Sequence, residues 1–188
     1  ERIQVLATRD ELTGAYNRRQ GMKLLNEWQA LPSSRRTDPA DACLGLLLVD
    51  VDHFKLVNDS LGHPAGDLVL RAVAERLQQQ LRDGDALARI GGEEFMVLLP
   101  AVPRATLLPL ADRLRVAVAA EPIMAGGQAL TVHISVGVVA MQAGDSPAWA
   151  LAQADAALYR SKHLGRNRVT LADRQGPPEA SASAMTAG

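Results

Sequence analysis

Several features that define common protein classes are scarce in this chain of 188 residues. A single cysteine, Cys43, excludes an internal disulfide framework and is typical of a reducing compartment. No apolar run approaches the roughly 20 residues that a membrane-spanning helix needs, and the first residues lack the pattern of a signal peptide. The formal net charge of -1 gives no general electrostatic reason to bind nucleic acid. We therefore expect a cytoplasmic domain that does not bind nucleic acid.

The composition is that of one globular domain from a longer protein. Hydrophobic residues make up 47% of the chain and charged residues 22%, which is enough apolar material for a core. The sequence starts with Glu1 instead of Met, so we expect that an upstream sensory or membrane region is missing from it. Residues 172–188 are rich in Pro, Gly, Ala and Ser and predict a flexible tail. The predicted domain covers residues 1–171, with residues 1–9 as the end of an upstream linker.

Hydrophobic periodicity predicts an alternation of strands and helices. An interrupted helix over residues 6–31 and a polar loop come first, and the apolar run that ends at Asp50 has the length of a strand. In chain order we then expect a helix at 63–81, strands at 86–90 and 95–100 joined by a hairpin at Gly91 and Gly92, a helix at 105–120, a strand within 130–140, a helix at 148–162 and a strand at 167–172. The order β-α-β-β-α-β is that of the ferredoxin-like arrangement. It predicts an α+β fold with an antiparallel sheet and helices on one face.

Acidic residues stand at the predicted end of the first strand and in the hairpin. These two segments are expected in the middle of the sheet, so Asp50 can lie beside Glu93 and Glu94. Three carboxylates that converge repel one another unless a divalent cation neutralises them, and hard oxygen ligands select Mg²⁺ or Mn²⁺. The pattern therefore indicates a metal-nucleotide site. The alternative is a hairpin tip with solvated glutamates, which the sequence GGEE on its own would favour.

Cationic groups stand where a nucleotide site needs them. Lys55 follows the first strand, and Lys162 and Arg166 lie in the segment SKHLGRNR, so that together they can neutralise a triphosphate. The backbone amides of the turn at His53, Phe54 and Lys55 can line its oxygens. Each lysine taken singly is more often a surface charge.

Two polar residues, Asn58 and Asp67, flank the turn into the next predicted helix. A carboxylate that accepts hydrogen bonds from a ring N–H and an exocyclic amine favours guanine, because adenine has no donor on its ring nitrogen. The alternative interpretations are a turn residue and an acid at a helix N-terminus.

Together these segments resemble the GGDEF-domain diguanylate cyclase family, here in the GGEEF variant at 91–95. The resemblance also rests on DELTGAYNRR, VDVDHFKLVNDSLGHPAGD, ISVGVV and ADAALYRSKHLGRNRV, which follow the family's order from Asp10 to Val169. A chance match across five separated segments is negligible. The family implies the α+β palm of nucleotidyl cyclases, with an antiparallel-rich sheet and surrounding helices. It also implies condensation of two GTP into cyclic di-GMP with release of pyrophosphate.

The resemblance implies a metal-dependent active site at the end of the first strand. Asp50 and Glu93 would bind Mg²⁺ or Mn²⁺ with help from the carbonyl of Val51, and Glu94 would be a further metal ligand or the general base. Asp52 matches the family's pattern too, and we expect a structural role for it.

The resemblance also implies how GTP binds. Asn58 and Asp67 would read guanine, while Gly91 and Gly92 would let the backbone approach the nucleotide closely. The β- and γ-phosphates would be held by three cationic residues, Lys55, Lys162 and Arg166. Each subunit of a homodimer would hold one GTP, because the 3′-hydroxyl of one GTP attacks the α-phosphorus of the other. A monomer would then bind GTP without turnover.

A second site is implied by the segment RDGD at 82–85. It resembles the family's inhibitory RxxD motif, with Arg82 and Asp85 shortly before the glycines and Arg113 as a supporting arginine. Arginine can form paired hydrogen bonds to phosphate or to a guanine edge, and aspartate accepts from guanine N–H groups. We expect the product to bind here and inhibit the enzyme. The alternative is a charged helix end followed by a turn.

Two other functions stay open at this point. A catalytically silent GTP-binding or cyclic di-GMP receptor module would usually lack an acid of the glycine-acid motif or one of the guanine-reading residues, and here all are present. A cyclase with relaxed base choice would have no use for the acceptor at Asp67. We therefore predict an active diguanylate cyclase.

Overall fold

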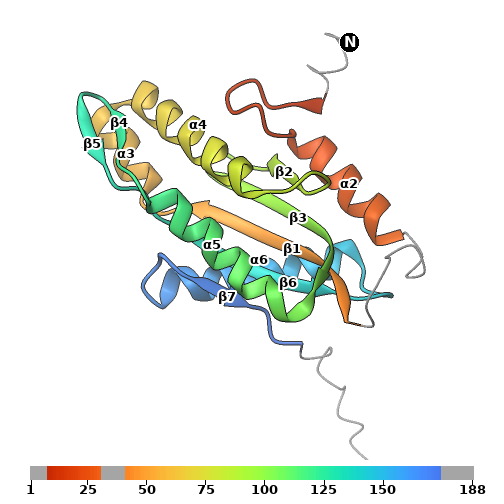
Figure 1. Ribbon diagram of the computed structural model, residues 1–188. Coiled ribbons are helices and arrows are strands. Elements are labelled where there is room, and N and C mark those ends of the chain that lie inside the picture. Colours follow the sequence, from red (N-terminus) through yellow and green to blue (C-terminus); the bar gives the residue numbers. More distant parts are fainter. Residues whose placement is uncertain (1–7, 31–40, 175–188) are drawn as a thin grey trace, which may run out of the picture.

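Strand β1 (Ala42–Val51) is the central strand of a five-stranded sheet in the computed structural model, which describes residues 8–30 and 41–174 (Figure 1). The strand order is β2-β3-β1-β6-β7, in which β1 pairs antiparallel with β3 and β6, and β7 pairs parallel with β6. The other strands of this sheet are β2 (Ala86–Arg89), β3 (Glu94–Pro103), β6 (Ile134–Met141) and β7 (Val169–Leu171). The predicted α+β fold with an antiparallel-rich sheet is confirmed.

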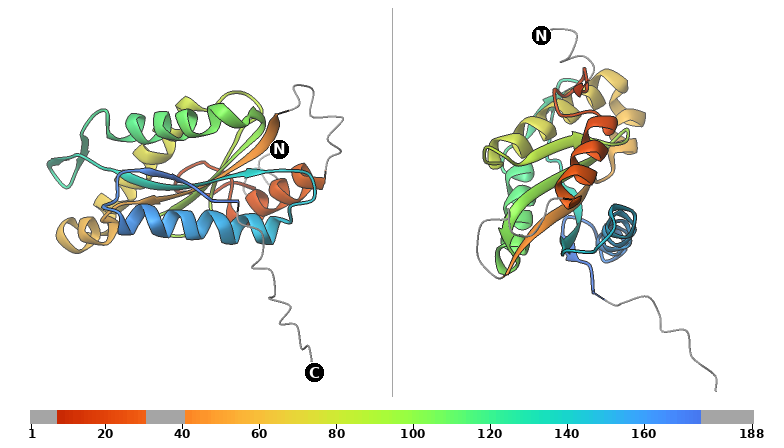
Figure 2. Two further views of the ribbon diagram at one scale, coloured as in Figure 1. Left: turned by 90° about the horizontal axis from the view of Figure 1, so that it is seen from below. Right: turned by 90° about the vertical axis from the view of Figure 1, so that its right-hand side faces the viewer.

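Helices cover both faces of the sheet (Figure 2). They are α2 (Arg18–Ala30), α3 (Phe54–Leu61), α4 (His63–Gln80), α5 (Leu107–Ala119) and α6 (Pro147–His163), with the short 3-10 helix η2 (Arg104–Thr106) before α5. Helices α4 and α5 pack on the face to which Leu47 and Val49 point, whereas α2 and α6 pack on the face of Leu46 and Leu48. The prediction of helices on one face was wrong. The apolar run of β1 is continuous because the strand is buried on both faces.

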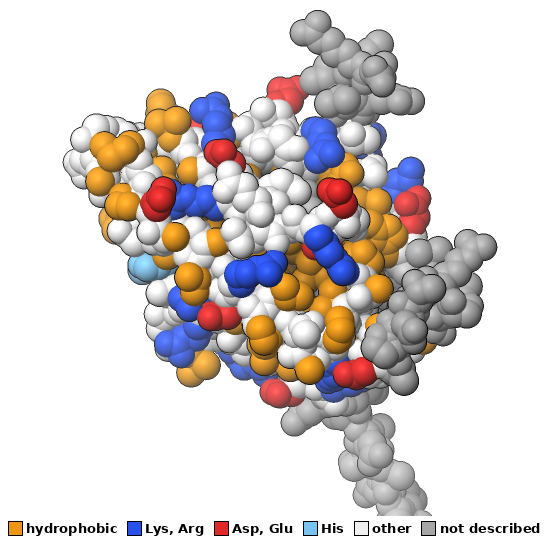
Figure 3. Space-filling view, in the orientation of Figure 1, with side chains coloured by type: hydrophobic (Ala, Val, Ile, Leu, Met, Phe, Trp, Pro, Cys, Tyr) orange, Lys and Arg blue, Asp and Glu red, His pale blue; other side chains and the backbone are white. Residues whose placement is uncertain are grey.

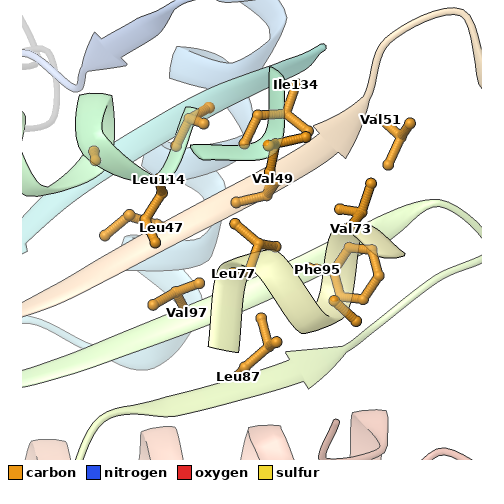
Figure 4. Close-up of a cluster of buried hydrophobic side chains, with 14 of the residues drawn as sticks. Leu47, Val49, Val51, Val73, Leu77, Leu87, Phe95, Val97, Leu114 and Ile134 are labelled. Atoms are coloured by element: carbon orange, nitrogen blue, oxygen red, sulfur yellow. The ribbon is translucent and has the colours of Figure 1, made fainter. Parts of the chain in front are cut away.

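The larger core lies between the sheet and helices α4 and α5 (Figure 4). In it, Leu47 and Val49 of β1 cluster with Leu77 of α4 and Leu114 of α5, all at most 2% exposed. Full burial of one such side chain stabilises the fold by about 1.5–3 kcal/mol. This packing fixes β1 against α4, and it therefore also fixes the position of the polar residues at the end of β1.

The second core lies between the sheet and helices α2 and α6, and in it helix α6 packs very closely on strand β6. The buried side chains of α6 are mainly alanines, namely Ala150, Ala154 and Ala157. A methyl group added at Gly137 of β6 would overlap the carbonyl oxygen of Ala154 and the backbone nitrogen of Leu158. This close approach brings the C-terminal end of α6, with Lys162, to the end of β1.

Two elements differ from the sequence-based prediction. The expected turn at 53–55 is the start of a separate helix, α3, which is divided from α4 by Gly62 with φ 84°. Eight residues are too few for a clear helical period in the sequence. A hairpin of β4 (Ile123–Ala125) and β5 (Gln128–Leu130) was also missed, although Gly126-Gly127 between apolar residues is a hairpin signal, and both glycines have positive φ.

Parts of the predicted chain organisation fall outside the described residues. These are most of the linker at 1–9, most of the loop at 31–42 and most of the tail at 172–188, so the domain bounds stay a prediction. Within the described ranges, no helix combines the length and the apolar character that crossing a membrane requires.

The contact between β6 and α6 gives a prediction about stability. Gly137→Ala is expected to lower the free energy of unfolding by roughly 1–3 kcal/mol, because the new methyl group meets backbone atoms that cannot rotate away. Gly45→Ala on β1 is the matched control, since its methyl group meets only side-chain atoms of Leu107 and Leu99. Urea unfolding of both variants measures the difference, and an equal or larger loss for Gly45→Ala would contradict the prediction.

Candidate active site

The predicted acids meet at the ends of two neighbouring strands. Asp50, next to the last residue of β1, lies directly opposite Glu94, the first residue of β3. The backbone nitrogen of Val51 donates to the carbonyl oxygen of Glu93 at 3.2 Å, which ties the connection before β3 to β1. Antiparallel pairing of β1 with β3 therefore brings the two segments together, as the sequence predicted.

The connection between β2 and β3 is longer than the predicted Gly-Gly turn. Strand β2 ends at Arg89 and β3 begins at Glu94, so Ile90 and Glu93 also belong to the connection, and neither glycine has positive φ. A methyl group at Gly91 would lie 2.5 Å from a carboxylate oxygen of Glu94, whereas one at Gly92 would meet no atom within 4 Å. Gly91 thus leaves room for the Glu94 carboxylate, and Gly92 leaves the backbone accessible.

Arg89 holds this connection in place, a role that sequence reasoning missed. Its Nη2 donates to the carbonyl oxygen of Gly92 at 2.8 Å, and its Nη1 lies 3.2 Å from both carboxylate oxygens of Asp10. Asp10 in turn accepts from the backbone and the hydroxyl of Thr13. The signal was an arginine shortly before the two glycines, together with the acid and threonine of the segment DELT.

Asp50 is a buried carboxylate with one close cation. It is 5% exposed, and its Oδ2 lies 2.8 Å from Nζ of Lys162. Burial raises the pKa of the Asp50 carboxyl, the charges of Glu94 and Asp52 raise it further, and Lys162 opposes both. Burial also raises the pKa of Glu93, followed by the charge of Asp50. The folded domain therefore places acids where their ionised forms are unfavourable.

The acids are neighbours, but they do not converge on one point. Across residues 8–30 and 41–174, no three His, Cys, Asp or Glu side chains form a group ready to hold a metal ion. Joint binding of one metal ion by Asp50, Glu93 and Glu94 therefore stays a prediction. Asp50 turns towards the ammonium group of Lys162, because a buried carboxylate without a compensating cation is costly.

One pocket of about 400 Å³ collects most of the predicted site. Eight of the predicted residues line it: Asp50, Val51, His53, Phe54, Lys55, Glu93, Lys162 and Arg166. A larger pocket of about 720 Å³ lies between the segment from Arg9 to Tyr16 and helix α4, but it contains none of these eight. The smaller pocket is the better candidate for a nucleotide site because the buried acid Asp50 and the half-buried acid Glu93 meet cationic side chains there.

The start of helix α3 forms one wall of this pocket. His53 precedes the helix with φ 57° and ψ 26°, a left-handed conformation that is uncommon for a residue with a side chain. The first backbone amides of a helix have no partner within it, and the helix dipole favours negative charge at this end. Phe54 is 6% exposed and part of the core, so it offers only its backbone. The Lys55 side chain is 86% exposed and pairs with Asp59 at 2.7 Å.

Asn58 and Asp67 lie outside the lining of this pocket, on helices α3 and α4 respectively. Oδ1 of Asn58 is buried and has no hydrogen-bond partner among the described residues. A methyl group at Gly66 would overlap this oxygen, so the glycine makes room for the Asn58 amide. A buried acceptor without a donor is unusual, because most buried polar atoms in proteins have a hydrogen-bond partner.

The predicted product site lies at the other end of α4. Nε of Arg82 is 3.1 Å from Oδ1 of Asp85, whose side chain is only 6% exposed. Nη2 of Arg113 on α5 donates to the carbonyl oxygen of Gln80 at 2.7 Å, two residues before Arg82. The structure thus brings the three residues to one region, and none of them lines the pocket around Asp50.

Comparison with known sequences identifies the family. The sequence model described as diguanylate cyclase, GGDEF domain, matches residues 7–168. This chain belongs to the GGDEF-domain diguanylate cyclase family. Diguanylate cyclase DgcP of Pseudomonas aeruginosa is 42% identical to this GGDEF domain over 166 residues, which are 88% of this chain and 24% of that protein. Response regulator PleD of Caulobacter vibrioides is 41% identical over 167 residues, 87% of this chain and 36% of that protein.

Solved structures of GGDEF domains have the same fold. The coiled coil and GGDEF domain of DgcB from Caulobacter crescentus, in complex with c-di-GMP, has a TM-score of 0.81 at 30% identity and covers 91% of this chain and 88% of that chain. The active GGEEF domain of a diguanylate cyclase from Vibrio cholerae has a TM-score of 0.74 at 31% identity. That match covers 85% of this chain and 98% of the Vibrio cholerae chain. The predicted family and fold are confirmed. The chain spans only 24% and 36% of the two curated relatives named above.

The charges in the pocket of this GGDEF domain give a prediction about pH. Glu93→Gln is expected to stabilise the protein at pH 7, because the raised pKa of Glu93 means that folding disfavours its ionised form. The gain should vanish near pH 4 and below, where the glutamate is protonated in the folded state and increasingly in the unfolded state.

Urea unfolding at the two pH values measures this difference. Glu75→Gln on the exposed side of α4 is the matched control, because it removes a glutamate that lines no part of this pocket. A loss of stability at pH 7 in Glu93→Gln, or a gain that is the same at both pH values, would contradict the prediction.

Proposed function

We propose that this domain condenses two GTP molecules into cyclic di-GMP and releases two pyrophosphates. The observation that carries the proposal is the pocket in which Asp50 and Glu93 meet Lys162 and Arg166 beside the start of α3, in a chain of the GGDEF family. Acids suited to a metal, cations suited to phosphate and free helix amides are the groups that nucleotidyl transfer uses. Burial raises the pKa of Asp50 and Glu93, so placing these two acids in the pocket does not stabilise the fold, and perturbed acids in a pocket are typical of functional sites.

The donor set fits Mg²⁺ or Mn²⁺. Asp50, Glu93 and Glu94 offer hard carboxylate oxygens, and the carbonyl of Val51 is the fourth proposed ligand. Burial first, and the charges of neighbouring acids as well, raise the pKa values of Asp50 and Glu93, and a divalent cation would favour the ionised forms of both. Such a cation would lower the pKa of the attacking hydroxyl and stabilise the leaving pyrophosphate. Lys162 would then be released from Asp50 to bind phosphate.

The phosphates are proposed to bind at the start of α3, and the base beside Asn58 of α3 and Asp67 of α4. Lys55, Lys162 and Arg166 would hold the β- and γ-phosphates together with the amides at the start of the helix. Asn58, with its buried acceptor oxygen, and Asp67 would read guanine. Gly92, beside open space, would let the nucleotide approach the backbone.

The reaction needs two such pockets. In each of two steps the 3′-oxygen of one GTP bonds to the α-phosphorus of the other, the bond from that phosphorus to the bridging oxygen breaks, and pyrophosphate leaves. The hydroxyl proton passes to a base, for which Glu94, opposite Asp50, is the candidate. Because the attacking 3′-hydroxyl belongs to a second GTP, we propose a homodimer in which each subunit holds one GTP and the two pockets face each other. The control of this dimer by an upstream region is part of the same proposal.

A turnover assay at increasing protein concentration tests the proposal. Pyrophosphate release from GTP should need Mg²⁺ or Mn²⁺, stop with a chelator, and rise more steeply than linearly with protein concentration until the dimer is saturated. Glu94→Ala should lower the turnover by about 100-fold or more and leave the unfolding midpoint nearly unchanged. Glu75→Ala on α4 serves as the control for loss of one glutamate.

The alternative is a silent receptor for GTP or cyclic di-GMP. Binding of GTP without pyrophosphate release, at concentrations where the protein is dimeric, would support that function and overturn the cyclase. Release of pyrophosphate with ATP as readily as with GTP would instead overturn the guanine-reading role of Asn58 and Asp67.

We further propose that cyclic di-GMP inhibits the enzyme through Arg82, Asp85 and Arg113. Charge-assisted hydrogen bonds from two arginines suit its phosphates, and Asp85 suits guanine N–H groups. The DgcB structure, by its description, is a complex with c-di-GMP. Arg82→Ala should raise the product concentration needed for half-inhibition by at least about tenfold, measured against the variant's own initial rate. Arg104→Ala on η2 is the control, and an unchanged inhibition curve for Arg82→Ala would remove this site.

A further inference from the structure

The turn that carries Arg166 has a backbone conformation that needs support. Gly165, Arg166 and Asn167 have φ of 116°, 62° and 44°, so three consecutive residues are left-handed and two of them have side chains. Such conformations persist only where surrounding contacts hold them. The turn follows α6 directly and precedes β7, and Arg166 is its one residue that lines the pocket around Asp50.

Hydrogen bonds from three separate elements hold this turn. The backbone nitrogen of Arg166 donates to the carbonyl oxygen of Ser161 on α6 at 3.0 Å. The backbone nitrogen of Asn167 donates to Oδ2 of Asp52 at 2.9 Å, and Asp52 is buried and also accepts from the hydroxyl of Ser135 at 2.7 Å. Asp52 therefore joins the end of β1 to β6 and to the turn.

Helix α5 supplies the third support through Arg115. Nη1 of Arg115 donates to Oδ1 of Asn167 at 2.8 Å, and its Nε donates to Oδ1 of Asp112 at 2.6 Å, which orients the guanidinium group. Arg115 and Asn167 line a separate pocket of about 510 Å³ and not the pocket around Asp50. Arg115 is therefore not among the residues that line the pocket around Asp50.

We propose that Arg115 is a positioning residue, which acts with Asp52 on Asn167 to fix the left-handed turn and so to aim Arg166 at the terminal phosphates of the substrate. The described residues offer no hydrogen-bond partner to the guanidinium group of Arg166, so the backbone of the turn fixes the point from which this side chain extends towards the pocket. The inference rests on the proposed function, in which Arg166 binds phosphate. It adds a residue of α5, outside the site, to the determinants of substrate affinity.

The test measures binding without turnover. The ligand is a GTP analogue with a methylene group between the α- and β-phosphorus, which cannot release pyrophosphate, and GMP, which lacks the terminal phosphates, is the second ligand. Arg115→Gln should weaken binding of the analogue by about 3- to 10-fold, as expected for loss of one directing hydrogen bond, and leave binding of GMP unchanged. Asn167→Gly should do the same, because glycine keeps the positive φ and removes the acceptor.

Two controls separate positioning from general loosening of the fold. In an Arg166→Ala background, Arg115→Gln should cause no further loss of analogue affinity, because it acts through Arg166. Arg160 is the matched control: its guanidinium group pairs with the carboxylate of Asp173 and the carbonyl oxygen of Leu171, but it does not contact the turn. Arg160→Gln should therefore leave the affinities for the analogue and for GMP unchanged.

Each outcome decides between the proposals. Unchanged analogue binding in Arg115→Gln, equal weakening for GMP, or a further loss in the Arg166→Ala background would overturn the positioning role. A wild-type protein that binds the analogue no more tightly than GMP would instead overturn the phosphate-binding role on which the proposed function rests. If the variants change analogue binding as expected but the protein makes no cyclic di-GMP, only the proposed cyclase activity is overturned. The positioning role of Arg115 then stands.

Discussion

Burial of strand β1 on both faces is the constraint on which the site depends. Because α4 and α5 cover one face and α2 and α6 the other, β1 can change from apolar to polar residues only at its end, at Asp50 and Asp52. Antiparallel pairing with β3 then places Glu94 opposite Asp50. The alanines of α6 and Gly137 of β6 bring that helix close enough for Lys162 to reach the same carboxylate.

The site concentrates unfavourable features that the two cores must offset. The unfavourable features all lie at one end of the sheet: the acids Asp50 and Glu93 with raised pKa values, a left-handed His53, and a turn of left-handed residues around Arg166. Mixed charges cover the face seen in Figure 3, where Lys and Arg are interspersed with Asp and Glu, in keeping with a net charge of -1. Attraction of a polyanion therefore depends on the few cations of the pocket and not on the field of the whole domain.

Hydrophobic periodicity in the sequence predicted an element well where the element is long enough to show a clear helical period. The helix expected at 63–81 is α4 at His63–Gln80, because Pro64 marks its start and leucines and valines recur on one face. The prediction failed for α3, which is too short to show a period, and for the placement of helices on one face of the sheet. A continuous apolar strand was the sign of burial on both faces, and it outweighs the expectation from the order of elements.

By itself, the sequence determined the kinds of groups in the candidate site and their order: acids at the end of an apolar strand, two glycines before two glutamates, and cations at and after the end of the last long helix. Only the tertiary structure decided which of them share a pocket, that Asp50 pairs with Lys162, and that Asn58 and Asp67 stand apart from that pocket. It alone linked Arg115 to Asn167. The reason is physical: a period in the sequence reports which residues share a face of one element, whereas contacts between distant segments depend on how closely those elements pack.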